Sequence, residues 1–329
     1  SNARFFVSEG RLVYALGALK NVGAEAMTLI ENARCDKMFV NLFDFARRVD
    51  LKRIGKRPME MLARSGAFDQ LDPNRRRVFA SLDALVNYSA AIHEQRSSNQ
   101  VSLFGEAGDD LPEPRLSPVD DWLPNERLAE EHKAIGFYLS GHPLDDYMVP
   151  LKRKGVMTVA DLRVAAERAP MIAKLAGAIS GKQERKSARG NRFAFVQLSD
   201  PSGLYEVTVF SDTLEAARDV LEVGANVVLT VEANVESEQL KLLARSIAPI
   251  DAVAADAGGM GLKVFVDNGQ AVDSVKSLLD RMTDPRKSRA GGPLVFCVAD
   301  RETGTEYDIS PDQKFALNPQ IKGAIKSLG

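Results

Sequence analysis

Five residues, Gln100-Val101-Ser102-Leu103-Phe104, combine a side-chain amide with two adjacent large apolar groups in an otherwise polar segment. The residues that follow, 105–114, are rich in glycine, proline and acids, a composition that favours an unfolded linker. Leu103 and Phe104 are costly to leave in water unless a partner buries them. The pattern suits an extended peptide whose apolar pair enters one pocket while the Gln100 amide bonds at its rim. A chance pentapeptide at the end of a helix is the alternative.

Basic side chains that could meet nucleic-acid phosphates gather in two segments, although the net charge of the 329-residue chain is only −2. Residues 47–57 contain six basic side chains and one acid, and residues 174–192 again contain six and one. Between them, residues 106–121 carry six acids and one arginine. Two basic modules joined by an acidic connector are the resulting pattern, which favours contact with nucleic acid.

No combination of side chains in the sequence has the spacing of a catalytic or metal site. Cys35 and Cys297 lie far apart, which excludes a cysteine metal motif and fits a reducing cytoplasm. His142 has no cysteine, serine or carboxylate pairing that singles it out, and a structural turn is favoured there. We therefore expect no catalytic residue, no metal and no cofactor. The sequence also shows no membrane-length apolar run and no signal peptide, so a cytoplasmic location is expected.

Residues 4–96 are predicted to form an all-α tandem helix-hairpin-helix module. Apolar spacing predicts a helix through Leu12 and Leu19, a second helix over 26–33, and later helices ending with a long one over 75–96. A weaker second hairpin is expected at 65–68, with Phe68 in the core.

The first hairpin turn carries the candidate contacts to duplex DNA. Gly23 is expected to supply φ > 0 and Asn21 to tolerate the left-handed region, so that N–H groups at the start of the next helix face a phosphate. A plain connection between helices is the alternative. The candidate residues are Lys20, Asn21, Val22 and Gly23.

Residues 171–250 change from helical to strand periodicity. Strands are predicted over 174–179, 192–198 and 204–210, followed by a helix over 212–221 and strands over 226–232 and 240–250. This order is that of an OB-fold β-barrel. The basic segment from Lys182 to Arg192 is expected to be the loop that joins the first two strands, beside a groove for single-stranded nucleic acid.

Aromatic side chains near this basic segment could stack on bases. At least one of Phe193 and Phe195 is expected in the core, because alternation places both on one face. The basic segment could also serve only to keep a long loop soluble. The candidate single-strand contacts are Lys182, Arg185, Lys186, Arg189, Arg192, Phe193 and Tyr205.

The expected fold class is multidomain: helix-hairpin-helix module, OB-fold β-barrel and small α+β C-terminal domain. The expected parts are a tag remnant (1–3), the helical module (4–96), a linker with the pentapeptide and a mixed connector (97–170), the OB-fold (171–250), a short linker (251–260) and the α+β domain (261–329). The chain enters mid-pattern at Arg4, which suggests a fragment of a longer protein.

This order of modules resembles the C-terminal region of the bacterial replicative DNA polymerase III alpha subunits, which are C-family polymerases. The resemblance is close at 14–23, 64–69, 100–105 and 136–144, the last reading Gly-Phe-Tyr-Leu-Ser-Gly-His-Pro-Leu, and it fades after Asp251. It implies that residues 100–104 bind the sliding clamp (beta subunit), that the OB-fold meets the template single strand, and that the last domain binds the tau subunit of the clamp loader. It also implies that the polymerase carboxylates lie upstream, so that this chain has no active site although its parent is a DNA-directed DNA polymerase.

Two other classes of protein combine some of these modules. A DNA repair enzyme such as a bacterial ligase also carries helix-hairpin-helix and OB units, but its Lys-x-Asp-Gly site does not occur in this sequence. A free-standing single-strand binding protein would need neither the helical half nor the pentapeptide.

Overall fold

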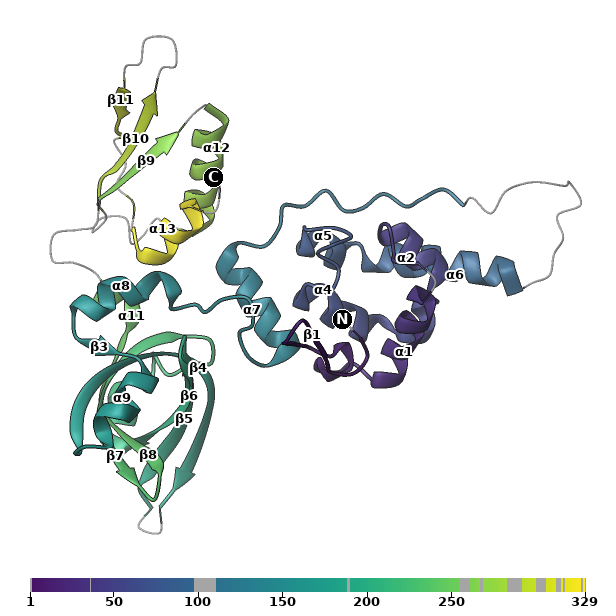
Figure 1. Cartoon of the computed structure of the whole chain (residues 1–329). Coiled ribbons are helices and arrows are strands. Elements are labelled where there is room, and N and C mark those ends of the chain that lie inside the picture. Colours follow the sequence, from purple (N-terminus) through teal and green to yellow (C-terminus); the bar gives the residue numbers. More distant parts are fainter. Residues whose placement is uncertain are drawn as a thin grey trace, which may run out of the picture. The chain divides into compact units, whose positions relative to one another are not determined.

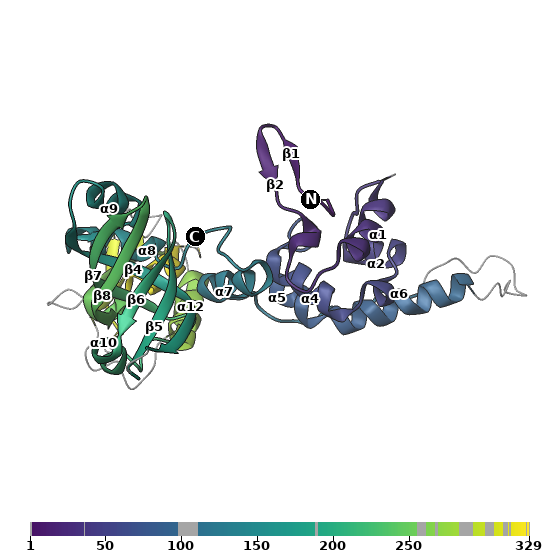
Figure 2. The same cartoon turned by 90° about the horizontal axis from the view of Figure 1, so that it is seen from below.

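The computed structural model describes residues 2–35, 37–97, 111–187, 190–254, 261–266, 269–282, 292–299, 306–311, 315, 317–326 and 328. The chain divides into two compact units, residues 1–140 and 141–329. Figures 1 and 2 show that helices build most of the first unit, whereas the second contains a barrel and a smaller sheet with its own helices.

The first unit begins with a β-hairpin of β1 (Phe6–Ser8) and β2 (Arg11–Val13), followed by a 3-10 helix, η1 (Leu16–Ala18). Fully buried side chains such as Met27, Phe45 and Leu62 form its core. The α-helices of this unit are α1 (Ala24–Arg34), α2 (Leu42–Arg48), α3 (Leu51–Ile54), α4 (Lys56–Ser65), α5 (Arg75–Ala80), α6 (Leu82–Ser97) and α7 (Pro124–Ile135).

Two of the predicted helices differ from the structure. The helix expected through Leu12 is wrong, because Glu9 and Gly10 take positive φ and turn the chain into the β1–β2 hairpin. The long helix expected over 75–96 is interrupted at Ser81, which is buried and whose hydroxyl accepts a hydrogen bond from the Ser117 N–H at 2.9 Å. The helix expected over 26–33 is present as α1.

The barrel of the second unit is closed. Its strands are β4 (Met171–Lys186), β5 (Arg192–Asp200), β6 (Gly203–Phe210), β7 (Asn226–Glu236) and β8 (Gln239–Pro249). They pair in the order β4-β5-β6-β8-β7, and a β4–β7 pairing closes the ring. Within this ring β6 and β8 are parallel and the other neighbouring strands are antiparallel. This is the Greek-key strand order of the OB-fold, which confirms the predicted barrel.

Short elements surround the barrel. They are α8 (Asp145–Arg153), β3 (Val156–Met157), α9 (Val159–Ala166), α10 (Ser211–Ala216) and α11 (Ile250–Ala254). α10 takes the place of the helix expected over 212–221, and β3 pairs with β4 in parallel.

The small α+β region expected at the end of the chain is also present. Strands β9 (Leu262–Val266), β10 (Leu294–Ala299) and β11 (Glu306–Ile309) form a sheet in the order β11-β10-β9, with helices α12 (Gly269–Met282) and α13 (Pro319–Lys326). The finer domain boundaries expected from the sequence stay a prediction. Among the described residues, no helix is both long and apolar enough to cross a bilayer.

Candidate nucleic-acid interface

The basic segment of the barrel is mostly strand, not loop. β4 continues to Lys186, where it pairs with Arg192, and Arg185 pairs with Phe193. The loop expected over 182–192 is therefore wrong for most of its length, because backbone pairing with β5 satisfies the N–H and C=O groups while the charged side chains stay in water. Arg189 lies outside the described residues.

Strand alternation divides these basic side chains between two faces of the β4–β5 hairpin. A register shift between Ile179 and Gly181 sets the alternation of β4. Lys182 lies opposite Val196, which is fully buried in the barrel core. Directly paired residues share a face of the sheet, so Lys182 and every second residue from it lie on the inner face. We define the inner face by Lys182, Glu184, Lys186 and Arg192, and the outer face by Arg185, Phe193, Phe195 and Phe210.

The outer face carries an aromatic cluster. The rings of Phe193 and Phe195 are 5.4 Å apart at 85° to each other, and the Arg185 guanidinium carbon lies 5.4 Å from the Phe195 ring centre. Phe210 pairs with Phe193 across the strands and is 54% exposed. Half-exposed rings beside a guanidinium are the side chains that proteins use to stack on unpaired bases.

Neither Phe193 nor Phe195 belongs to the barrel core, so the expectation that one of them would be buried is wrong. The core position between them is filled by Ala194, and the next one by Val196. Phe193 and Phe195 alternate with these core residues along β5, so they lie on the opposite face of the strand and are only partly buried.

Tyr205 lies in the barrel interior, so its assignment as a stacking platform is also wrong. Only 8% of its surface is exposed, and its hydroxyl donates to the Ala176 carbonyl at 2.9 Å. Burial raises the pKa of this hydroxyl well above its usual value. The outward aromatic residue of β6 is Phe210. In the strand alternation it lies on the same side as the polar Glu206 and Thr208, whereas Tyr205 lies on the side of the buried Val207.

The inner face borders a pocket of about 360 Å³. Lys182 forms an ion pair with Glu184 at 3.2 Å, which uses part of the positive charge of this face. Two acids, Glu184 and Glu215, oppose the two arginines in the lining of this pocket, so it is a poor site for a polyanion. It is lined by Glu184, Gly190, Asn191, Arg192, Ser211, Leu214, Glu215 and Arg218.

In the first unit, the turn that precedes α1 contains the residues predicted to contact duplex DNA. Asn21 has φ +59°, as expected, but Gly23 has φ −83° and ψ 143°, so the expectation of positive φ at Gly23 is wrong. The left-handed step falls on Asn21, whose side chain tolerates it. Gly23 becomes the N-cap of α1 and has no side chain that could cap the helix. Lys20 and Asn21 are exposed, whereas Val22 is buried in the core and cannot contact a ligand through its side chain.

The second turn, at 65–69, is filled by a buried arginine. Gly66 has φ +80°, and a Cβ there would overlap the guanidinium of Arg75. This guanidinium bonds to Asp69 at 2.8 Å and to Glu131 at 3.3 Å. Burial alone would lower the pKa of Arg75, but these carboxylates raise it above its usual value. Phe68 is buried, as predicted, so this turn is structural.

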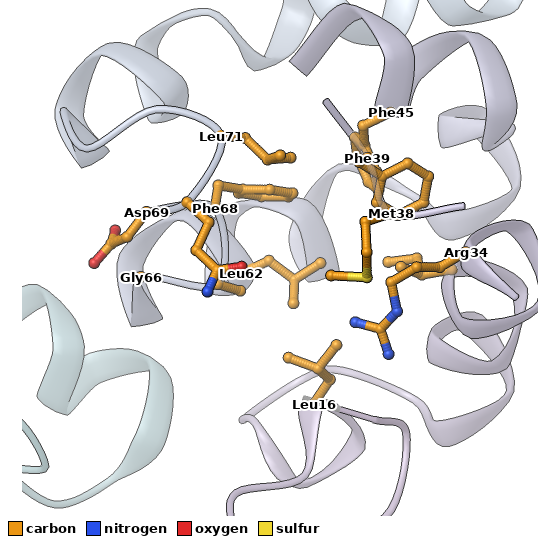
Figure 3. Close-up of a pocket in the computed structure, with 13 residues that line it drawn as sticks. Leu16, Arg34, Met38, Phe39, Phe45, Leu62, Gly66, Phe68, Asp69 and Leu71 are labelled. Carbon is orange, nitrogen blue, oxygen red and sulfur yellow. The ribbon is translucent and has the colours of Figure 1, made fainter. Parts of the chain in front are cut away.

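A mostly apolar pocket of about 380 Å³ lies beside the second turn (Figure 3). Leu16 of η1 and Phe68 of the second turn both line it. Its charged residues are already engaged, since Arg34 donates to Asn2 at 2.8 Å and Asp69 binds Arg75. We therefore see no catalytic chemistry in it.

The pentapeptide predicted to bind a partner (Gln100, Val101, Ser102, Leu103 and Phe104) falls outside the part of the chain that the structure describes. Within the described residues, no group of three or more His, Cys, Asp or Glu could hold a metal ion.

Comparisons with known proteins cover the whole chain. A family model of the helix-hairpin-helix motif matches residues 1–78. The chain is 36% identical to the DNA polymerase III subunit alpha of Caulobacter vibrioides over 99% of this chain and 28% of that one. It is 34% identical to the subunit of the same name from Neisseria meningitidis over 97% and 27% of the two chains. The chain thus spans little more than a quarter of the length of these relatives.

Among solved structures, the SSB domain of a Synechococcus protein is similar to 23% of this chain and 91% of its own, at 17% identity and a TM-score of 0.22. The assignment of the barrel to the OB-fold depends on its own strand order and not on this similarity.

Proposed function

The chain belongs to the family of the bacterial DNA polymerase III alpha subunit, and we propose that it is a non-catalytic, DNA-contacting part of such a subunit. The whole subunit would add nucleotides to DNA as a DNA-directed DNA polymerase. We propose that this chain contributes binding surfaces only, with no active site and no cofactor of its own.

The outer face of the barrel is the observation that carries this proposal. Phe193, Phe195 and Phe210 present aromatic surface beside Arg185 on adjacent strands of an OB-fold. Stacking accepts every base because every base has a π-face, so we propose that this face binds single-stranded DNA with little sequence preference. In OB barrels the face of the second and third strands commonly binds oligonucleotides. These strands are β5 and β6 here, and they carry Phe193, Phe195 and Phe210, which supports the same assignment.

The test is binding of a fluorescent single-stranded oligonucleotide to the full chain at low salt. Stacking of one base on one ring contributes about 1–3 kcal/mol, so Phe193→Ala with Phe195→Ala should weaken binding at least tenfold. Phe265→Ala is the matched control, because Phe265 is a phenylalanine on β9 that is 67% exposed. An affinity of the double variant equal to that of the control would end the proposal.

The first helix turn is proposed to contact duplex DNA. Lys20 and Asn21 are exposed beside Gly23, and α1 begins there without a side-chain cap from Gly23. A positive side chain at a helix N-terminus favours a phosphate. Lys20→Ala should weaken binding to a duplex and leave binding to a single strand unchanged.

Residues 100–104 are proposed to bind the sliding clamp, on the basis of their resemblance to the family's clamp peptide. Burial of Leu103 and Phe104 would contribute about 1.5–3 kcal/mol each, less the cost of ordering the segment. Leu103→Ala with Phe104→Ala should abolish clamp binding and leave the melting temperature unchanged.

Residues 261–329 are proposed to bind the tau subunit of the clamp loader. The support is the family resemblance together with the small α+β region that the chain forms there. Deletion of residues 256–329 should remove loader binding and spare clamp binding.

A further inference from the structure

The segment 136–144 joins the two units, and the side chains around its first half fix it to the first unit. Glu131, on α7, is 1% exposed, and one of its oxygens accepts hydrogen bonds from the backbone N–H groups of Leu139 (2.8 Å) and Ser140 (2.9 Å). Arg75 balances the buried charge at the other carboxylate oxygen. Charge-assisted bonds in a buried site hold a backbone tightly, because breaking them leaves a carboxylate unpaired.

Ring contacts hold the same half of the segment. Phe137 packs edge-on against Tyr14 with ring centres 5.7 Å apart, and Tyr138 lies 4.7 Å from His132. The chain is therefore fixed to the first unit as far as Ser140.

The second half is fixed to the second unit through His142. The backbone N–H of His142 donates to Asp145 at 2.7 Å, and the ring Nδ1 accepts from the Leu144 N–H at 3.2 Å. The proton of the neutral ring must then be on Nε2, which donates to the Ser199 hydroxyl on β5 at 3.0 Å. Leu144 is fully buried, so the chain is fixed again from His142 onward.

Between these two anchored stretches lies one residue, Gly141. We propose that Gly141 is the pivot about which the two units change their relative orientation. Glycine has the widest range of φ and ψ, and hinges in proteins are a few residues that absorb such changes. The anchors on either side, Glu131 and His142, confine the rotation to the dihedral angles of this residue, where a flexible linker would spread it over many.

The test is single-molecule energy transfer in the full chain between a dye on each unit. The exposed thiol of Cys35 carries the dye of the first unit. Gln239→Cys, at the exposed start of β8, carries the dye of the second, and Cys297→Ser removes the other thiol. A reference protein carries both dyes on the second unit, at Arg153→Cys and Gln239→Cys, with both native thiols changed to serine. The chain with a dye on each unit should give a broader distribution of transfer efficiency than this reference.

Substitutions at the pivot and at its anchors should act in opposite directions. Gly141→Pro should narrow the distribution of transfer efficiency toward that of the reference protein. Gly141→Val should narrow it in part, and it serves as a second variant if proline prevents folding. His142→Ala removes one anchor and should broaden the distribution of transfer efficiency. A wild-type distribution as narrow as the reference, or a folded Gly141 variant as broad as the wild type, would overturn the proposal.

Discussion

The two faces of the β4–β5 hairpin are built from the same short segment but present different chemistry. On the outer face, Arg185 meets aromatic rings that lie partly in solvent. On the inner face, Lys182 is paired with Glu184, and Arg192 borders a pocket that also contains Glu215. A run of basic residues in a strand is thus not one binding site. Successive side chains point to opposite faces, so a ligand on one face meets only about half of them.

The largest expected effect concerns Phe210, which extends the outer face onto β6. Phe210→Ala should weaken single-strand binding by about 1–3 kcal/mol, or about 5- to 150-fold, because one stacking surface is lost. Leu204→Ala is the control, since Leu204 points out of the same strand and is 71% exposed. Fluorescence anisotropy gives both affinities, and equal losses in the two variants would mean that exposed apolar area, and not stacking, sets the affinity.

The next prediction concerns Tyr205, which lies on the same strand as Phe210 and should affect stability but not DNA binding. Tyr205→Phe removes the hydrogen bond to the Ala176 carbonyl and should lower the free energy of unfolding by about 1 kcal/mol. Because the ring lies inside the barrel, the affinity for single-stranded DNA should stay at the wild-type value. Urea denaturation measures the stability, and fluorescence anisotropy measures the affinity. A large loss of affinity without a loss of stability would show that Tyr205 contacts the DNA.

The smallest effect depends on pH. Burial lowers the pKa of His142 below its usual value, although Asp145 and Asp200 oppose this. The unfolded chain then binds a proton more readily than the folded one, so this contribution to stability is complete above about pH 6.5 and is lost as the pH falls below it.

His142→Gln should therefore reduce the difference in unfolding free energy between pH 7.5 and pH 5.5. The difference should not vanish, because burial and the charge of Lys20 also lower the pKa of His132. Single-strand affinity at pH 7.5 should not change. An unaltered pH dependence would show that His142 does not titrate in this range.

The barrel could be predicted from the sequence because its core strands alternate clearly. In 204–210 the buried residues and the outward ones change places at every step, and the same rule would have placed Tyr205 inside and Phe210 outside. The candidate face was therefore readable in principle. Position in the strand, and not aromatic type, decides which ring reaches the surface.

Other features could not be read from local sequence. The extension of β4 to Lys186 depends on its pairing with β5. A run of charged residues has low intrinsic strand propensity, so the sequence alone does not predict this extension. At the first helix turn, a glycine was present where positive φ was expected, yet the structure uses Asn21 for that step. Gly66 and Arg75 are nine residues apart in the sequence, and only the fold brings the guanidinium against the glycine.

The most direct test of the central claim compares Arg185→Ala with Lys186→Ala, two adjacent basic residues on opposite faces of one strand. The measurement is the slope of log K against log salt for single-stranded DNA, in which each neutralised phosphate contributes about 0.7. We predict that Arg185→Ala reduces the steepness of the slope by about 0.7, whereas Lys186→Ala leaves it unchanged. Equal changes in both variants, or a change in Lys186→Ala alone, would contradict the assignment of the outer face as the binding surface.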